Sequence, residues 1–234
     1  MHVADCSARP HRRAADVCSC VDHARSSAGT ESASGRTRLM PDLSLTDHDS
    51  QPEAARRLVD STMIGTSPRA DVFATTYQLP DGSLRPNYLV VHERSGTLVV
   101  AITDTNHLLL VGQYRAPVNT FLWELPAGAL EGGDANPLER ASAELLEETG
   151  FTATEWHDLG TFHAAPHRST ETDHGYLALG AHRAADQHLD PGESVRVRLV
   201  PMADVDQMLA RGEIRSGPSM AVLLRGLRLL AQLR

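Results

Sequence analysis

The sequence predicts an α+β fold, in which a mixed β-sheet carries a helix on each face and a small β-strand subdomain precedes it. Two observations support this prediction. Short β-rich runs separated by turn signals fill the chain from about residue 72 to residue 123 and recur after residue 151. Stretches with helical spacing lie between and after these runs, over residues 137–149, 201–211 and 218–233.

The expected strands begin with two pairs. Asp-Gly within Pro80-Asp81-Gly82-Ser83 is a strong hairpin signal between the first two runs, and Asp104-Thr105-Asn106 separates the second two. These four strands are expected over residues 72–79, 85–91, 97–103 and 107–114. Residues 116–123 then lead into the first helix, and later strands are expected over residues 152–162, 176–181 and 194–200.

The first helix has the most definite boundaries. Asn136 is a suitable N-cap, Pro137 suits the first helical position, Glu139 follows the cap by three residues, and Gly150 ends the helix. The last helix has a broad apolar stripe, made of Met220, Leu223, Leu224, Leu227 and Leu230.

The first helix is expected to carry carboxylates on one face. At about 100° per residue, Glu144, Glu147 and Glu148 fall within one arc of roughly 100°. The opposite arc is apolar and is expected to pack, with Leu138, Leu145 and Leu146. A solvated acidic face is the simplest explanation for three glutamates. However, like charges at these spacings repel by a few tenths of a kcal/mol per pair, so a cation or a function should offset them.

The segment before this helix favours a ligand site. Pro126-Ala127-Gly128 leads into a glycine-rich loop with Gly132 and Gly133, where the backbone can approach a ligand closely. Carboxylates on a rigid helix beside such a loop are hard oxygen ligands, which suit Mg²⁺ or Mn²⁺.

Composition limits the classes of partner. Of the 234 residues, 41% are hydrophobic and 22% are charged, which is typical of a soluble globular protein. No apolar run approaches the ~18 residues of a membrane span. A formal charge of −8 argues against nucleic acid or an anionic membrane as the main partner. A polyanionic substrate would therefore need a bound divalent metal to mediate the contact.

The first fifty residues are rich in Ser, Ala, Arg, His and Asp without periodicity, and we expect them to be a disordered tail. They hold no apolar segment typical of a secretory signal, and Met40 is an alternative start. All three cysteines lie in the tail, in a spacing that matches no zinc pattern, so a reducing compartment such as the cytoplasm fits best.

The segment from Gly128 onwards resembles the Nudix box, G-x5-E-x7-R-E-U-x-E-E-x-G-U, where U is a bulky apolar residue. Gly128 and the run from Glu144 to Phe151 match it, which includes the half that binds metal in the family. The other half departs from the pattern, because Asp134 replaces the glutamate, one residue is inserted, and Ala143 replaces the arginine. Arg140 either takes over the bracing role of that arginine or forms an ordinary i,i+4 ion pair with Glu144.

A second resemblance is more specific. Gln113-Tyr114-Arg115, followed by Trp123-Glu124-Leu125-Pro126-Ala127-Gly128, is similar to the ADP-ribose pyrophosphatase branch of the Nudix superfamily, and the likeness covers roughly residues 70 to 230. It implies an α/β/α sandwich, so we expect an N-terminal β-subdomain over 51–95 after the tail of residues 1–50, and a Nudix domain over 96–234 that includes the C-terminal helix. It implies metal ligands at Ala127, Glu144, Glu147 and Glu148. It also implies substrate contacts at Arg115, Glu124 and Gly128, where the guanidinium suits a diphosphate.

The polar stretch from His163 to His174 is long enough for a functional loop. In the family branch, the corresponding loop carries a Ser/Thr-Glu pair whose glutamate activates the water. Thr170-Glu171 matches that pair, which makes Glu171 a catalytic candidate. Glu147, among the helix carboxylates, is the second catalytic candidate. His167 and Arg168 stand where the family usually has glycines, which leaves the substrate open.

These resemblances imply metal-dependent hydrolysis of a nucleoside diphosphate linked to another group, with ADP-ribose giving AMP and ribose 5-phosphate as the first choice. The cofactor would be Mg²⁺ or Mn²⁺. The branch also implies a cytoplasmic homodimer built through the N-terminal strands. Two alternatives stay open, namely a nucleotide-sugar pyrophosphatase of the same fold and a Nudix-like module that binds ADP-ribose or NAD-related ligands without turnover.

Overall fold

The computed structural model describes residues 56–131, 136–189 and 192–233. The predicted tail with Met40 and the cysteines, and the loop residues Gly132, Gly133 and Asp134, lie outside these ranges. Within the described residues, no helix is long and apolar enough to cross a membrane.

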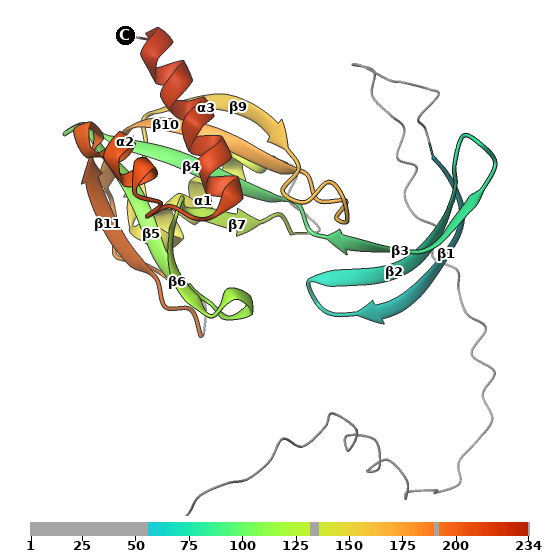
Figure 1. Ribbon diagram of the computed structural model, residues 1–234. Coiled ribbons are helices and arrows are strands. Elements are labelled where there is room, and N and C mark those ends of the chain that lie inside the picture. Colours follow the sequence, from blue (N-terminus) through green and yellow to red (C-terminus); the bar gives the residue numbers. More distant parts are fainter. Residues whose placement is uncertain (1–55, 132–135, 190–191, 234) are drawn as a thin grey trace, which may run out of the picture. The chain divides into compact units, whose positions relative to one another are not determined.

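Three antiparallel strands form an N-terminal sheet: β1 (Arg57–Thr66), β2 (Ala70–Gln78) and β3 (Leu84–Glu93), in the order β1-β2-β3 (Figure 1). The hairpin between β2 and β3 is as predicted. Gly82 has a φ of 83°, and the Gly82 N–H donates to the carbonyl of Leu79 at 2.9 Å. Strand β1 was not among the strands that the sequence predicted.

The second sheet is mixed and contains eight strands. Its central order is β11-β5-β4-β10-β8, with β6 paired to β5, β7 paired to β4 and β9 paired to β10. Strand β10 runs parallel to β4, and the other pairs are antiparallel. The strands are β4 (Gly96–Thr103), β5 (His107–Arg115), β6 (Thr120–Glu124), β7 (Ala127–Ala129), β8 (Phe151–Thr152), β9 (Glu155–Phe162), β10 (Asp173–Arg183) and β11 (Arg196–Pro201).

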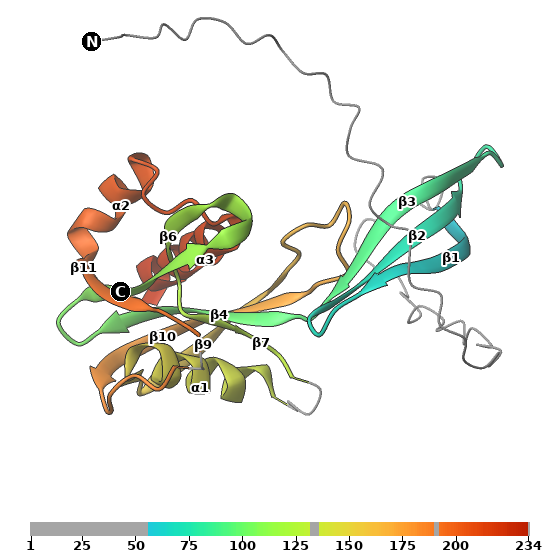
Figure 2. The ribbon, with the colours of Figure 1, turned by 90° about the horizontal axis from the view of Figure 1, so that it is seen from below.

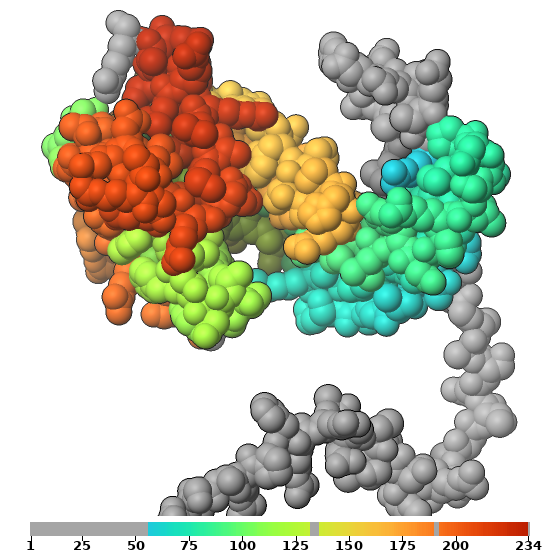
Figure 3. Space-filling model, viewed as in Figure 1, coloured from blue at the N-terminus to red at the C-terminus, as the bar shows by residue number. Residues whose placement is uncertain are grey.

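Helices cover both faces of this mixed sheet, as the predicted sandwich requires. Helix α1 (Pro137–Thr149) lies on one face, and α2 (Met202–Ala210) and α3 (Gly217–Leu233) lie on the other (Figure 2). The space-filling view shows the orange and red atoms of α2 and α3 together over their face (Figure 3). The fold is therefore α+β, with the sheet between helices.

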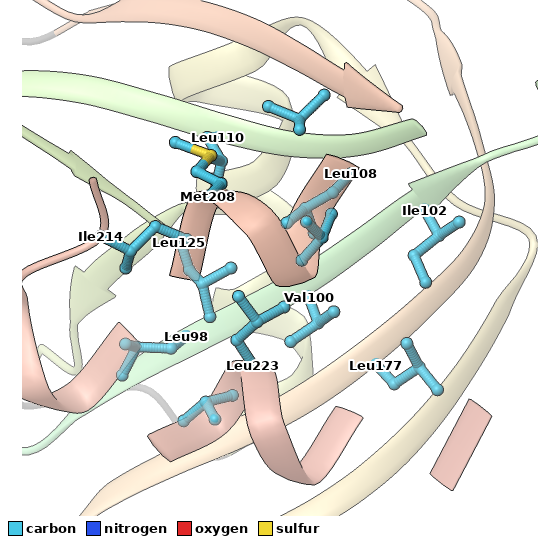
Figure 4. Close-up of a cluster of buried hydrophobic side chains, with 13 residues drawn as sticks. Leu98, Val100, Ile102, Leu108, Leu110, Leu125, Leu177, Met208, Ile214 and Leu223 are labelled. Carbon is cyan, nitrogen blue, oxygen red and sulfur yellow. The ribbon is translucent and has the colours of Figure 1, made fainter. Parts of the chain in front are cut away.

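Alternate side chains of the central strands pack on opposite faces, because successive residues of a strand point in opposite directions. Leu98, Val100 and Ile102 belong to the cluster with α2 and α3 (Figure 4), whereas Val99 and Ala101 belong to the cluster with α1. The core therefore holds β4 rigidly between two layers of helices, and β4 is the strand against which β7 and β10 are placed.

Two predicted packing positions are wrong. Leu146 of α1 is 38% exposed, and Leu224 of α3 is 57% exposed. The buried stripe of α3 instead includes Val222 and Gly226, which a pattern of large apolar residues overlooks. Gly226 lies so close to β4 that a Cβ there would be 3.0 Å from a methyl group of Val100. The absence of a side chain thus lets the helix approach the sheet.

Candidate active site

Helix α1 is fixed by its two ends, as the sequence predicted. The Asn136 side chain accepts a hydrogen bond from the Leu138 N–H at 3.0 Å, and Pro137 follows as the first helical residue. At the other end Gly150 takes a φ of 74°, and its N–H donates to the Leu146 carbonyl at 2.8 Å. These caps fix where the helix begins and ends, and its buried residues Ala141 and Leu145 pack in the core cluster beneath it.

Two of those carboxylates face the Ala127–Gly128 segment of β7. The Ala127 N–H donates to Glu148 Oε2 at 3.0 Å, and the Gln113 side chain donates to Glu148 Oε1 at 2.8 Å. Glu144 lies against Gly128, where an added Cβ would be only 1.5 Å from Glu144 Oε1. Glu144 is 7% exposed and Glu148 is 5% exposed, so both are buried against this segment.

Glu147 is less confined than its neighbours. Its side chain is 43% exposed, and Arg140 Nη1 donates to Glu147 Oε2 at 3.4 Å. Arg140 also forms an ion pair with Glu144 across one helical turn. The expected Arg140–Glu144 pair is therefore confirmed, and the same guanidinium contacts Glu147 as well.

Burial dominates the electrostatics of the α1 carboxylates. It raises the pKa of Glu148 to about 8, which the Ala127 N–H opposes and the nearby Glu144 and Glu193 carboxylates reinforce. Burial also raises the pKa of Glu144, with Arg140 opposing it. Several carboxylates held near one another away from water favour a bound cation, because a cation offsets the cost of charging them.

The donor atoms suit a divalent metal, although the side chains are not arranged as a finished site. Among the described residues, no group of three or more His, Cys, Asp or Glu side chains is placed to hold a metal ion. Glu144 and Glu148 offer carboxylate oxygens next to Ala127–Gly128, and these are hard donors of the kind that Mg²⁺ prefers. Glu147 would have to turn away from Arg140 to join them.

A cavity of about 490 Å³ gathers most of the predicted site residues. The predicted residues that line it are Arg115, Glu124, Ala127, Gly128, Glu144, Glu148 and Glu171, whereas Glu147 is not among the lining residues. Segments distant in the sequence thus line one cavity, which lies where β4, β5, β7, α1 and the loop before β10 come together.

Arg115, the last residue of β5, and Glu124, the last residue of β6, form an ion pair. Arg115 Nε donates to Glu124 Oε2 at 2.7 Å, and the Glu124 side chain is largely buried whereas that of Arg115 is 44% exposed. Glu124 therefore orients the guanidinium along the cavity wall. A fixed guanidinium is suited to binding phosphate oxygens.

The loop of residues 163–172 carries Glu171 to the same cavity. Thr170 and Arg168 exchange backbone hydrogen bonds with Val91 of β3, at 3.1 and 2.7 Å. The Glu171 N–H donates to Ser169 Oγ at 3.1 Å. The pKa of Glu171 is raised to about 7, first by burial and then by the carboxylates of Asp173 and Glu93.

Several lining residues were not predicted. Gln113 belongs to the Gln113-Tyr114-Arg115 motif, but the sequence does not predict its hydrogen bond to Glu148. Ser219 accepts a hydrogen bond from the buried Leu125 N–H at 3.1 Å and thereby joins α3 to the cavity wall. Further lining residues without a predicted role are Arg69, Glu93, Arg94, Asp173 and Glu193. No local pattern indicates them, because contacts between segments distant in the sequence bring them to the cavity.

Comparisons with known proteins identify a family, related sequences and a similar fold. The NUDIX domain family matches residues 92–223. An ADP-ribose pyrophosphatase of Bacillus subtilis (strain 168) is 31% identical over 145 residues, which is 62% of this chain and 77% of the relative. An ADP-ribose pyrophosphatase of Mycobacterium tuberculosis (strain ATCC 25618 / H37Rv) is 31% identical over 148 residues, or 63% and 71% of the two chains.

A solved structure described as an ADP compounds hydrolase has the same fold. It superposes with a TM-score of 0.68 at 19% identity, over 76% of this chain and 95% of the other. The family match, the relatives and the carboxylate helix facing Ala127–Gly128 lead to one assignment. This chain belongs to the Nudix family of pyrophosphohydrolases, in the branch that resembles ADP-ribose pyrophosphatases.

Proposed function

We propose that this protein hydrolyses the diphosphate bond of a nucleoside diphosphate linked to another group, and that ADP-ribose, giving AMP and ribose 5-phosphate, is its main substrate. The observation that carries this proposal is the single cavity lined by Arg115, by Glu144 and Glu148 of α1, and by Glu171 of the loop. Two relatives are named as ADP-ribose pyrophosphatases, which supports the choice of substrate.

Nudix hydrolases generally need divalent metal ions, and we propose Mg²⁺ or Mn²⁺ for this chain. The Ala127 carbonyl and the carboxylates of Glu144 and Glu148 would hold the metal, with Glu147 as the outer ligand because its side chain is half-exposed. Bound metal would neutralise charge on the phosphate oxygens and make a bound water more acidic. Glu144 and Glu148 would hold the metal at a fixed position, because both project from a capped helix.

Substrate binding is assigned to Arg115, Glu124 and Gly128, which line the same cavity as these carboxylates. Arg115, oriented by its 2.7 Å contact with Glu124, would bind the diphosphate or the adjoining sugar. Gly128 would let the substrate and Glu144 approach the backbone, because a side chain there would collide with the carboxylate. These residues orient the diphosphate with respect to the attacking water.

Glu171 is proposed as the general base. It lines the cavity on a loop that is bonded to β3 and to Ser169, so its carboxylate is presented to the substrate from outside the α1 cluster. Once deprotonated, it would take a proton from the attacking water while the diphosphate bond breaks. Glu147 would assist from the exposed edge of α1.

A substrate panel tests the proposal directly. ADP-ribose, nucleotide sugars and dinucleoside polyphosphates would each be incubated with the protein in Mg²⁺ and in Mn²⁺, and phosphate would be measured after coupling to a phosphatase. We expect ADP-ribose to give the highest kcat/KM and chromatography to identify AMP among the products. Absence of product from every compound, with both metals, would overturn the proposed activity.

A nucleotide-sugar substrate is the first alternative. His167 and Arg168 give the loop that carries Glu171 two bulky side chains, where the resemblance implies glycines. These side chains line a second, smaller cavity with Tyr77 and Tyr88 beside the loop. A nucleotide sugar with a higher kcat/KM than ADP-ribose in the same panel would favour this alternative.

A binding module without turnover is the second alternative. It is favoured by Ala143, which offers no guanidinium at the position of the arginine in the Nudix box. Such a module would show a rise in unfolding temperature with ADP-ribose and no AMP, in Mn²⁺ as well as in Mg²⁺. Detection of AMP formed at a rate proportional to protein concentration would exclude it.

We also propose that the chain forms a homodimer through the N-terminal sheet. Strands β1 and β3 expose large apolar side chains, namely Leu58, Val59, Met63, Ile64, Leu84 and Leu89. Ile64→Glu should convert a dimer to a monomer in size-exclusion chromatography with light scattering. Leu224→Glu, which alters a similarly exposed residue of α3, should leave the mass unchanged. A parental protein that runs as a monomer would refute the proposal.

A further inference from the structure

Asp173 is a buried carboxylate at the cavity to which the proposed mechanism assigns no role. It is the first residue of β10 and is only 4% exposed. Its Oδ1 accepts a hydrogen bond from the Gly96 N–H at 2.7 Å, at the point where β4 begins. Asp173 therefore joins the end of the loop that carries Glu171 to the rigid centre of the sheet.

The same stretch of β4 also places the segment that faces α1. In the β4–β7 pairing, Gly96 lies opposite Ala129 and Thr97 lies opposite Gly128. A Cβ on Gly96 would be 3.0 Å from the Gly128 carbonyl oxygen and 3.1 Å from Asp173 Oδ1. The Asp173 carboxylate and the Gly128 carbonyl thus flank a single glycine, which leaves no room for a side chain between them.

The side chain of Asp173 also forms a hydrogen bond with that of Glu171, and Glu93 forms another with Glu171. An ionised carboxylate is only an acceptor, so two carboxyl groups form a hydrogen bond only when one of them carries a proton. The Glu171–Asp173 pair is thus built to hold one proton between its members.

We propose that Asp173 is a positioning residue for Glu171, which it holds in place beside the Ala127–Gly128 segment through a shared proton, and that it sets the pH at which Glu171 accepts a proton from water. This inference rests on the proposed function of Glu171 as the base. While the two carboxyl groups share a proton, Glu171 cannot accept another proton from water. When the proton is lost to solvent, Glu171 is free to take one from the attacking water.

The surroundings of the pair are consistent with this role. Burial is the main cause that raises the pKa of Asp173, while the Gly96 N–H lowers it and Glu93 raises it. The other charged or titratable groups around the pair are His163, whose Nδ1 is 2.8 Å from the Glu171 carbonyl oxygen, His174 beside Asp173, and Arg69 and Arg94 of the cavity lining. Arg94 Nη2 donates to the Pro68 carbonyl at 2.9 Å, so that guanidinium is directed at the N-terminal sheet.

The test is the pH dependence of ADP-ribose hydrolysis by Asp173→Asn. Asparagine keeps the shape and an oxygen that accepts the Gly96 N–H, but it removes the negative charge beside Glu171. A base works only when deprotonated, so activity falls as the pH drops through its pKa, which is about 7 for Glu171. We expect the acid limb of kcat to move to lower pH by about one unit, with KM changed by less than about twofold.

Asp158→Asn is the matched control. Asp158 Oδ1 accepts a hydrogen bond from the Gly160 N–H at 2.7 Å, which is the same kind of contact to a glycine, but Asp158 is not among the cavity-lining residues. Its pH profile should coincide with the parental one. An unchanged acid limb in Asp173→Asn, or an equal shift in Asp158→Asn, would overturn the inference.

A second measurement does not depend on turnover. The Glu171 carboxyl carbon, assigned by its loss in Glu171→Gln, would be titrated by NMR in the full chain. We expect its midpoint to lie above the usual range for glutamate and to fall by about one unit in Asp173→Asn. A midpoint in the usual range would refute the pairing. If the midpoint shifts as expected but no substrate is hydrolysed, the proposed function fails while the shared proton stands.

Discussion

Two pairs of carboxylates line the same cavity and differ in what surrounds them. Glu144 and Glu148 project from a capped helix, and their carboxylate oxygens accept hydrogen bonds from Arg140, Gln113 and the Ala127 N–H. Glu171 and Asp173 lie at the end of a loop. The neighbours of the Glu171 side chain are themselves carboxylates, Asp173 and Glu93.

This difference separates two kinds of chemistry. Burial and nearby carboxylates raise the pKa in both pairs. The Ala127 N–H and the Arg140 guanidinium oppose that rise in the helix pair, and the Gly96 N–H opposes it at Asp173, whereas the side-chain neighbours of Glu171 raise its pKa. Donors around a carboxylate favour the charged form, and other carboxylates favour the protonated form. The helix pair, whose oxygens accept from Gln113, Ala127 and Arg140, is therefore suited to a cation, and Glu171, whose side-chain neighbours are carboxylates, is suited to exchanging a proton. Mutations should separate these two roles.

The largest effect is expected for Glu148→Gln. Glu148 accepts from both Gln113 and Ala127, so two hydrogen bonds hold its carboxylate in place. Loss of a metal ligand should remove several kcal/mol of transition-state stabilisation, and kcat/KM for ADP-ribose should fall about 10⁴-fold. Mn²⁺ should raise the unfolding temperature of the parental protein but not of the variant.

Glu139→Gln provides the control for that experiment. Glu139 lies in the first turn of the same helix but outside the cavity lining, and its contact is with Asn136. Its activity and its response to Mn²⁺ should match those of the parental protein. Parental activity in Glu148→Gln would remove Glu148 from the metal site.

The second largest effect is expected for Glu171→Gln, which acts on the other pair. Removal of a general base should lower kcat about 10³-fold. Because Glu171 is not part of the helix pair, Mn²⁺ should still raise the unfolding temperature of this variant as it does for the parental protein. Loss of the Mn²⁺ response here would show that the two pairs form one metal site.

The two pairs also differ in how far the sequence predicts them. The helix pair follows from local signals, since Asn136, Pro137 and Gly150 fix both ends of α1 and the spacing of the glutamates then fixes their face. The loop pair depends on pairing between distant segments. The bond from Gly96 to Asp173 spans 77 residues, and no pattern near Asp173 indicates it.

The errors in the predicted fold have the same origin. Leu224 matches the apolar stripe of α3, yet it is exposed, because the helix turns its small residue Gly226 towards Val100 instead. A prediction from hydrophobic periodicity uses the positions of large apolar side chains, so it does not reveal a close helix–sheet contact at a glycine. Tertiary contacts, which local spacing does not contain, thus decide which side of an amphipathic helix is buried.

Gly128→Ala should have an intermediate effect and tests how closely the backbone and the helix pair must approach. The added Cβ would be 1.5 Å from Glu144 Oε1, so the carboxylate must move. A displacement of about 1 Å at a catalytic group costs on the order of 10²-fold in rate. Gly217→Ala is the control, because a Cβ at Gly217 meets no atom within 4 Å. Equal rates for the two variants would mean that the contact between Gly128 and Glu144 is not needed.

The smallest effect is expected for Glu147→Gln. The Glu147 side chain is 43% exposed, and its contact with Arg140 is 3.4 Å long, so it is held less firmly than Glu144 or Glu148. An exposed ion pair contributes about 1 kcal/mol or less, and a ligand that must turn to reach the metal adds little more. We expect kcat/KM to fall by less than about tenfold. A loss as large as that of Glu148→Gln would show that Glu147 leaves Arg140 when metal binds. In that case the bound cation, more than the contacts of Glu147 within α1, would decide which glutamates form the site.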